Sequence, residues 1–371
     1  MMSVNSFISN SDFATAEHRS YVRLLLLLIG VAIAPLWLLW FDLEPLAGDV
    51  TRLGWYAERD FGWRAPQYYF THPLSDYATS YDRYHDVVVV GDSFSKEPSG
   101  DPPRHPNHWH NFLADMTGWS VLVLRHSEAP LPELLSRPAF VSSPPKILIY
   151  ERAERYMDQW LPRLQGGECT DRDAQPPEPL PRLVPRRAPR TIIERPKPTL
   201  DVNFGYVRRY LIHEALREGF GIDNGLVFKL GLTTPSLFSS AEGRQLLVYK
   251  DDFRKAQWKP DALDGLPCRL SRLKTLVEAN GKTRLLVLIA PDKLTAYGRY
   301  VLQRQYASLS RLEHFLDVNQ LPAPRIDQRL SSAIAKGEVD IYLPDNTHWG
   351  YRGHEIVAET VLDYLMSQQT R

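Results

Sequence analysis

Cysteine is nearly absent from this sequence: Cys169 and Cys268 are the only two among 371 residues. Two cysteines are too few for a disulfide-stabilised scaffold, and cysteines this isolated exclude a zinc site built on thiolates. A single bridge between them could form if the chain resides in an oxidising compartment. The chain is long enough to be stabilised by a buried core instead.

Net charge is also absent, because 44 lysine and arginine residues balance 44 aspartate and glutamate residues. This balance excludes a protein that binds nucleic acid through a broadly basic surface, so we expect no nucleic-acid partner. Hydrophobic residues make up 43% of the chain and charged residues 24%. These values exclude wholesale disorder and indicate one large globular domain or two smaller ones.

One long stretch contains no charged residue. Residues 24–41 read LLLLLIGVAIAPLWLLWF, and a helix of that length would span about 27 Å, close to the ~30 Å hydrocarbon core of a bilayer. Trp37 and Trp40 suit the interfacial aromatic belt. A cleaved signal peptide is the alternative, but its apolar region is usually only about 7–15 residues and ends at a small-residue cleavage site. We therefore expect an uncleaved membrane anchor.

The charges beside this stretch predict its orientation. Basic residues precede it, whereas acidic residues, Asp49 among them, follow it. The positive-inside rule then places residues 1–23 in the cytoplasm and the rest of the chain on the other side of the inner membrane, in the periplasm. We expect 42–84 to be a periplasmic lead-in and 85–371 to be the functional domain.

Beyond residue 85, short apolar runs alternate with helical patterns. Strands are predicted at 85–90, 120–124, 146–150, 284–290 and 339–343. Helices are predicted at 110–117, 268–279 and 353–366. This alternation predicts an α/β sandwich around a mostly parallel sheet.

A proline-rich stretch interrupts the alternation at about 161–200. Nine prolines there exclude regular structure, and several arginines occupy its second half. We interpret it as an insertion within the domain, because strands and helices resume beyond it. Its arginines either keep the surface soluble or form a groove or lid for an anionic partner.

Two short motifs carry residues for nucleophilic catalysis. Asp92 and Ser93 follow Gly91 directly after the strand at 85–90, and the carboxyl ends of parallel strands form the ligand crevice of such sheets. A serine needs a base that an acidic group orients. The sequence PDNTHW supplies Asp345 and His348 just before the last helix.

With these motifs the chain resembles the SGNH/GDSL hydrolase-like superfamily, and within it the alginate-type polysaccharide O-acetyltransferases. Further segments that carry the likeness are YERAER at 150–155, LLVYKDD at 246–252, APDKLTAY at 290–297 and THW at 347–349. The resemblance covers about 87–365. It implies an SGNH-like three-layer α/β/α sandwich.

The sequence departs from the family pattern at three places. Glu151 and Arg152 stand where the third block usually carries an asparagine, and Ser127 lies where the second block usually has a glycine. Asn346 occupies the position of the acid in the alginate-type relatives, and Asp345 precedes it by one place. Asp345 restores the older Asp-x-x-His spacing, so we expect it to be the acid.

The resemblance then assigns roles. Ser93 would attack an acyl carbonyl, His348 would accept its proton, and Asp345 would orient His348. The Ser93 N–H would donate one hydrogen bond to the oxyanion, and Arg152 or a backbone group near Ser127 would donate a second.

Other polar residues have both a functional and a structural interpretation. Asp92, Glu151, Lys293 and Trp349 are candidates for contacts with the substrate or the oxyanion. Alternatively, Glu151 and Arg152 form a buried ion pair that holds the third strand, and Lys293 begins a helix.

Three histidines, His105, His108 and His110, lie close together in RHPNHWHN. No carboxylate or cysteine at ligand spacing completes a metal site, and the neighbouring prolines suggest a surface loop. We therefore expect neither a metal nor a cofactor.

The leading functional hypothesis is a membrane-anchored periplasmic O-acetyltransferase that modifies an exported polysaccharide through a serine–histidine–aspartate triad. The resemblance implies a multi-pass membrane acyltransferase as its acyl-donor partner. One alternative is a carbohydrate acetyl esterase with the same triad. The other is a non-catalytic scaffold or polysaccharide-binding subunit of an export complex.

Overall fold

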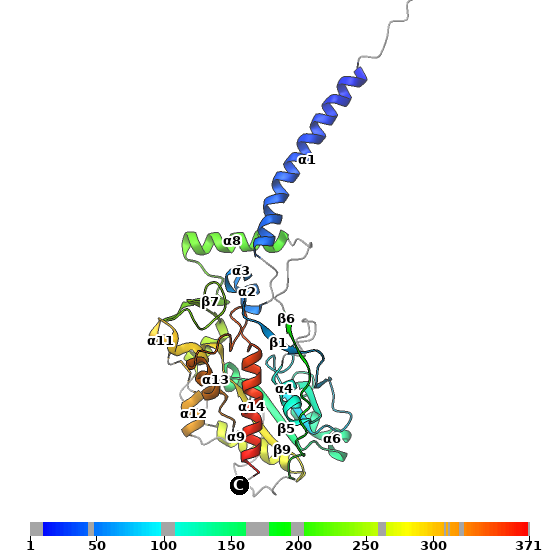
Figure 1. Ribbon diagram of the computed structural model, residues 1–371, viewed down its shortest axis with the longest axis vertical. Helices are drawn as coiled ribbons and strands as arrows, with labels where there is room; N and C mark the ends of the chain where they lie inside the picture. Colours follow the sequence, from blue (N-terminus) through cyan, green and yellow to red (C-terminus); the bar gives the residue numbers. More distant parts are fainter. Residues whose placement is uncertain are drawn as a thin grey trace, which may run out of the picture.

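The computed structural model describes residues 10–43, 48–97, 108–160, 178–193, 204–258, 265–307, 309–310, 312–318 and 323–369. A long first helix, α1 (Asn10–Leu43), stands out from an α/β body (Figure 1). Its segment His18–Leu39 has a mean hydropathy of 2.4 and none of it is buried. The segment is long and apolar enough to cross a membrane, although a signal sequence would have the same properties.

Five parallel strands form the central sheet, in the order β2-β4-β3-β5-β9. Their bounds are β2 (Asp76–Tyr77), β3 (Val87–Gly91), β4 (Val121–Arg125), β5 (Ile147–Ala153) and β9 (Arg284–Ala290). In the register, Val88 lies between Leu122 of β4 and Leu148 of β5. All five residues of β3 are buried, as expected of a central strand covered on both faces.

Helices cover both faces of this sheet. Val87 and Val89 belong to a core formed with α4 (Trp109–Thr117), α13 (Ile326–Ala335) and α14 (Tyr351–Ser367). Val88 and Val90 point the other way, into a core formed with α5 (Leu131–Ser136), α6 (Pro138–Ser142) and α9 (Leu266–Glu278). The predicted α/β sandwich with a mostly parallel sheet is confirmed.

Three predicted helices and four predicted strands lie within a few residues of their expected positions. The fifth predicted strand, 339–343, is wrong: it contains only an isolated bridge from Tyr342 to Trp349. Asp340 has a φ of 55° there, a left-handed conformation that breaks an extended run.

The segment after α1 is part of the body instead of a separate lead-in. It contains α2 (Asp49–Gly54), α3 (Glu58–Phe61), β1 (Gln67–Phe70) and β2. Since β2 pairs with β4 at the edge of the central sheet, the domain boundary predicted at residue 85 does not hold.

The described part of the proline-rich stretch, 178–193, runs along the body. Val184 N–H donates to Thr117 O at 2.7 Å, and β6 (Arg190–Ile193) pairs antiparallel with β1. The prediction of no regular structure is therefore wrong for β6, which contains no proline and so keeps every donor for its ladder. Cys169 lies outside the described residues, so the bridge that it could form with Cys268 is not described either.

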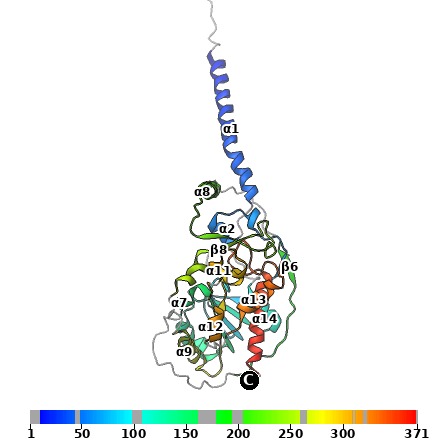
Figure 2. The same cartoon turned by 90° about the vertical axis from the view of Figure 1, so that its left-hand side faces the viewer.

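The remaining elements surround this core (Figures 1 and 2). They are η2 (Glu154–Tyr156), α7 (Met157–Trp160), α8 (Phe204–Phe220), the antiparallel pair β7 (Val227–Gly231) and β8 (Gln245–Tyr249), η3 (Lys250–Gln257), α10 (Lys293–Tyr297), η4 (Gly298–Tyr300), α11 (Arg304–Ala307) and α12 (Leu312–Val318).

Replacing Gly118, which ends α4, should test this packing. Gly118 has a φ of 76°, and a β-carbon there would stand 2.1 Å from Val184 O. Gly118→Ala should lower the free energy of unfolding by about 2 kcal/mol or more, because left-handed strain and a clash with backbone add together. The measurement is urea denaturation of the full chain in detergent.

Gly221→Ala is the matched control. Its φ is 65°, but nothing lies within 4 Å of the added carbon, so only the strain of about 1 kcal/mol should remain. Equal losses for the two variants would contradict the described contact between Gly118 and Val184.

Candidate active site

Ser93 lies on a tight turn at the carboxyl end of β3. Asp92 O accepts hydrogen bonds from Ser95 N–H at 3.1 Å and Lys96 N–H at 2.9 Å, which reverses the chain. Gly91 is required before the turn, because a β-carbon there would stand 2.6 Å from Glu151 Oε2. In the described part of 85–117, no helix lies between Ser93 and α4.

The Asp92 side chain stabilises this turn through hydrogen bonds. Its carboxylate accepts from Phe94 N–H at 3.1 Å and, through Oδ2, from Ala153 N–H on β5 at 2.8 Å. Both contacts are internal, so the side chain positions Ser93 and does not present an oxygen to a substrate.

Glu151 supports the turn from β5. It is buried and accepts from Asp92 N–H and Ser95 Oγ, each at 2.9 Å. Burial, reinforced by the nearby Asp92 charge, raises the pKa of Glu151 well above its usual range. The predicted ion pair with Arg152 is wrong, because successive strand residues point to opposite faces.

Two histidines hold the same turn from the start of α4. Buried His108 bonds Phe94 O through Nδ1 at 3.1 Å, and buried His110 bonds Ser95 O through Nε2 at 2.9 Å. The surface loop predicted for them is therefore wrong, while His105 lies outside the described residues. Among the residues that the structure describes, no group of three potential ligands could hold a metal.

The Ser93 hydroxyl contacts the His348 imidazole, although the two residues are 255 positions apart in the sequence. Oγ lies 2.9 Å from Nε2, the distance that proton transfer requires. Ser93 is half-buried and the His348 side chain is 16% exposed, so solvent reaches the pair. The Phe94 ring packs against the imidazole, 4.8 Å between centroids.

Asn346 fixes the tautomer of His348. Its Oδ1 accepts from the His348 backbone N–H at 3.1 Å and lies 2.7 Å from Nδ1. A backbone N–H can only donate, so the amide atom facing it is oxygen, and Nδ1 must therefore carry the proton. Nε2 is then left to accept the proton of the Ser93 hydroxyl.

Asp49 provides the nearest carboxylate to this imidazole. Its Oδ2 lies 3.4 Å from His348 Nδ1. Thr347 holds the carboxylate in place, donating its N–H to Oδ1 at 2.8 Å and its hydroxyl to Oδ2 at 2.6 Å. Asp49 is the first residue of α2, almost 300 positions before His348, and no spacing motif in the sequence indicates it.

The prediction that Asp345 orients His348 is wrong. Asp345 is buried, and its backbone oxygen accepts from Val50 N–H at 3.1 Å. Burial and then the neighbouring Glu58 raise the pKa of Asp345 well above its usual range. Among the described residues, Asn346 Oδ1 and Asp49 Oδ2, and not an oxygen of Asp345, lie at His348 Nδ1.

Lys293 begins α10, as expected, but it does not reach into the site. Its buried Nζ donates to three carbonyl oxygens of the loop before His348: Leu343 at 2.9 Å, Pro344 at 2.8 Å and Asn346 at 3.0 Å. Burial lowers the pKa of Lys293 to about 8. This side chain positions the loop that carries Asn346 and His348.

Sequence reasoning missed a buried charged network beneath the site. Arg155 pairs with Asp252 and, at 3.3 Å, with Asp292, while Lys255 Nζ donates to Asp292 Oδ2 at 2.8 Å and lies 3.4 Å from Glu154. These residues tie η2, η3 and α10 together. The motif YERAER contains two of them, yet its spacing does not reveal their partners.

Two predicted oxyanion donors have an N–H without a hydrogen-bond partner among the described residues. The Ser93 N–H donates no hydrogen bond to any residue in the described part of the chain. Arg152 donates from Nη1 to His126 Nε2 at 2.6 Å, and its Nε has no partner among the described residues. Burial, followed by the Arg152 charge, lowers the pKa of His126 to about 4, so neutral His126 can accept.

In the part of the chain that the structure describes, the side chains of Ser127 and Trp349 make no hydrogen bond to Ser93 or His348. Ser127 is exposed on the turn after β4. Trp349 is 2% exposed and packs against Phe94, 4.5 Å between ring centroids. The prediction of a substrate contact is therefore wrong for Trp349, which is a core residue behind the site.

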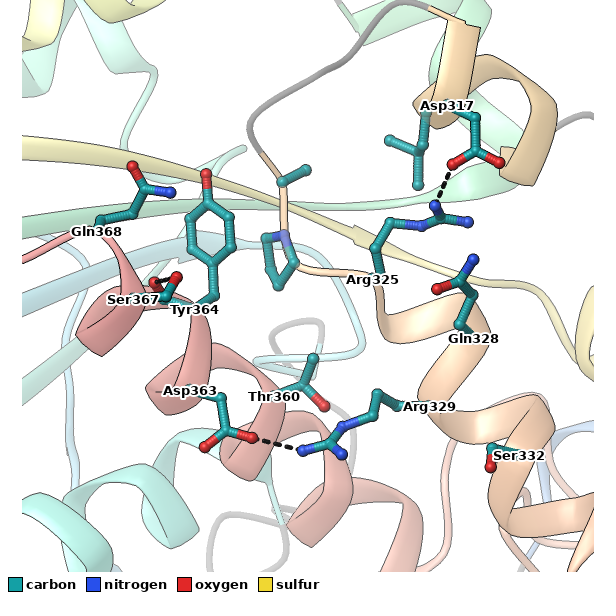
Figure 3. A pocket seen from close by; sticks show the side chains of 13 residues that line it. Asp317, Arg325, Gln328, Arg329, Ser332, Thr360, Asp363, Tyr364, Ser367 and Gln368 are labelled. Atoms are coloured by element: carbon teal, nitrogen blue, oxygen red, sulfur yellow. Dashed lines mark hydrogen bonds and ion pairs between the residues drawn. The ribbon is translucent and has the colours of Figure 1, made fainter. Parts of the chain in front are cut away.

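A hollow of about 890 Å³ lies elsewhere, between α13 and the carboxyl-terminal half of α14 (Figure 3). Arg325, Arg329 and Asp363 are among its lining residues, and Arg329 pairs with Asp363. It contains neither Ser93 nor His348, so we do not assign it to the candidate site.

Comparisons with known proteins add nothing to this geometry: no protein-family model, curated protein or solved structure matches the chain.

Replacing Asp49 and Asp345 separately by asparagine should show which of the two carboxylates assists His348. Asp49→Asn removes the charge beside His348 but keeps the size of the side chain, so the rate at which a fluorophosphonate labels Ser93 should fall at least about tenfold. Asp345→Asn changes a side chain that has no described contact with His348 Nδ1 and should leave this rate within about twofold. The measurement uses the full chain in detergent. A larger loss for Asp345→Asn would restore Asp345 as the acid.

Proposed function

We propose that this chain is a serine-dependent O-acyltransferase, anchored in the inner membrane, that acetylates an exported polysaccharide in the periplasm. The observation that carries the proposal is the 2.9 Å contact between Ser93 Oγ and His348 Nε2, with the Nδ1 proton held by Asn346. The choice of acetyl as the acyl group and of a polysaccharide as the acceptor rests on the resemblance to alginate-type O-acetyltransferases.

In the first half-reaction, Ser93 Oγ attacks the carbonyl carbon of the acyl donor while its proton passes to His348 Nε2. The imidazolium is stabilised by Asn346 Oδ1 and the Asp49 carboxylate. The Ser93 N–H, with Arg152 as second donor, stabilises the oxyanion. The leaving oxygen takes the proton from Nε2 as its bond to the acyl carbon breaks, which leaves an acyl-serine.

In the second half-reaction, a sugar hydroxyl replaces the donor. His348 Nε2 accepts the hydroxyl proton while the oxygen attacks the acyl-serine. Collapse of the intermediate forms the new ester and returns the proton to Ser93 Oγ. Water in the acceptor position would give hydrolysis instead, so the same residues could serve an esterase.

Helix α2, which begins with Asp49, lies at the end of the body from which α1 emerges (Figure 1). Asp49 lies six positions after Leu43, the last residue of α1, a span of at most about 22 Å. A site this close to the bilayer could receive an acyl group from a multi-pass membrane acyltransferase. Such a donor is needed because acetyl-CoA is not found outside the cytoplasm.

Replacing the nucleophile tests the proposal in cells that export the polymer. Ser93→Ala should leave the polymer yield unchanged and reduce its acetyl content at least about 100-fold, because no acyl-serine can form. Ser136→Ala, at an exposed serine on α5, is the matched control and should acetylate normally. Unchanged acetylation in Ser93→Ala would favour a scaffold or polysaccharide-binding role.

The two catalytic residues should also behave as one unit. Ser93→Ala, His348→Ala and the double variant should slow turnover of an acetyl ester by similar factors, because each change removes the same proton-transfer pair. Initial rates with the purified full chain measure this, and added polysaccharide shows whether the acyl group passes to sugar or to water. A double variant much slower than either single variant would contradict the pairing.

A further inference from the structure

Helix α8 (Phe204–Phe220) packs on the end of α1 through one of its faces. Val207 and Tyr210 are buried in a small core with Leu36 and Leu39 of α1. Farther along, Arg217 Nη2 donates to Gly54 O at 2.9 Å. These contacts fix α8 to both the apolar helix and the body.

Away from this contact, α8 exposes large apolar side chains together with Arg208 and Arg209. Leu211 is 43% exposed, Ile212 51% and Phe220, the last residue of the helix, 75%, and Ile222 just beyond the helix is 53% exposed. Arg208 lies next to Leu211 and Ile212 on a helical wheel and is also exposed. Large apolar side chains beside a basic one are typical of a helix that lies in a membrane interface.

The position of α8 matches the end of the candidate membrane segment. That segment ends at Leu39, and Leu39 belongs to the core that contains Val207 and Tyr210. Because packed helices lie about 8–10 Å apart, α8 is at the depth where α1 would leave the hydrocarbon. Figure 1 shows α8 lying across the end of α1, and Figure 2, where α8 is seen end-on, shows it beside that end and above the body.

We propose that α8 lies flat in the outer interface of the membrane, with Leu211, Ile212 and Phe220 among the acyl chains and Arg208 at anionic phospholipid headgroups. The occupant of this face is thus the bilayer itself, continuous with the surface that α1 already contacts. This second contact restricts rotation of the body about α1 and holds the Ser93 site at a constant height above the membrane.

Photocrosslinking tests this contact directly. The full chain, with p-benzoylphenylalanine in place of Ile212, is reconstituted into vesicles of phosphatidylethanolamine and phosphatidylglycerol and irradiated, and lipid adducts are measured by mass spectrometry. The adduct yield should exceed by at least about fivefold that of the same probe at Val141. Val141 is 67% exposed on α6, at the far end of the body (Figure 1).

A probe at Leu28 within α1 separates the possible failures. If the probe at Leu28 forms lipid adducts but the probe at Ile212 forms no more of them than the probe at Val141, the α8 proposal is wrong and the assignment of α1 as the anchor stands. Absence of adducts at both Leu28 and Ile212 would overturn both assignments. A covalent dimer at Ile212 in place of lipid adducts would assign the face to a second copy of the chain.

The role of Arg208 has its own test. With the probe at Phe220, Arg208→Glu should reduce the lipid-adduct yield about threefold in vesicles that contain phosphatidylglycerol. It should have no effect in vesicles of phosphatidylcholine alone. An equal loss in both kinds of vesicle would contradict electrostatic binding to anionic headgroups.

Discussion

The loop from residue 343 to 348 has no regular structure, yet it must hold an imidazole within 2.9 Å of a serine. Its buried polar groups need partners from elsewhere in the chain. Lys293 binds three of its carbonyl oxygens, and Asp49 binds both the N–H and the hydroxyl of Thr347. The candidate site therefore depends on two charged side chains that contact this loop from different elements.

The carboxyl groups near the site differ in their burial. Glu151 and Asp345 are enclosed, and burial raises the pKa of each well above its usual range. Asp49 retains 17% exposure of its side chain and stands 3.4 Å from His348. Among Glu151, Asp345 and Asp49, only Asp49 combines contact with solvent and proximity to His348 Nδ1. Asp49 is therefore the acid suited to stabilise an imidazolium at His348.

Much of the framework could be predicted from local patterns. The run VVVV predicts a strand buried on both faces, and the glycine after 110–117 predicts the end of a helix. Ser93 and His348 could also be found, because each follows or precedes an element whose type is clear. Asp345 was misassigned because the direction of a loop side chain depends on backbone angles that residue spacing does not specify.

Other features depend on contacts between distant segments. Asp49 reaches His348 only because the segment after α1 packs on the body, where Gly48 admits no β-carbon: one would stand 1.9 Å from Asp345 O. His108 and His110 stabilise the serine turn although their neighbours suggest a surface loop. No pattern of hydrophobicity indicates such pairings, because they follow from how the loops fold back across the sheet.

The central claim is that Ser93 carries an acyl group during the reaction. The full chain can be mixed with p-nitrophenyl acetate, quenched in acid within the first turnover, digested and examined by mass spectrometry. The account predicts an acetyl group on the peptide that contains Ser93, at the hydroxyl of that residue, and none there in His348→Ala. Ester turnover with no adduct at Ser93, or with acetylation at Ser93 independent of His348, would contradict it.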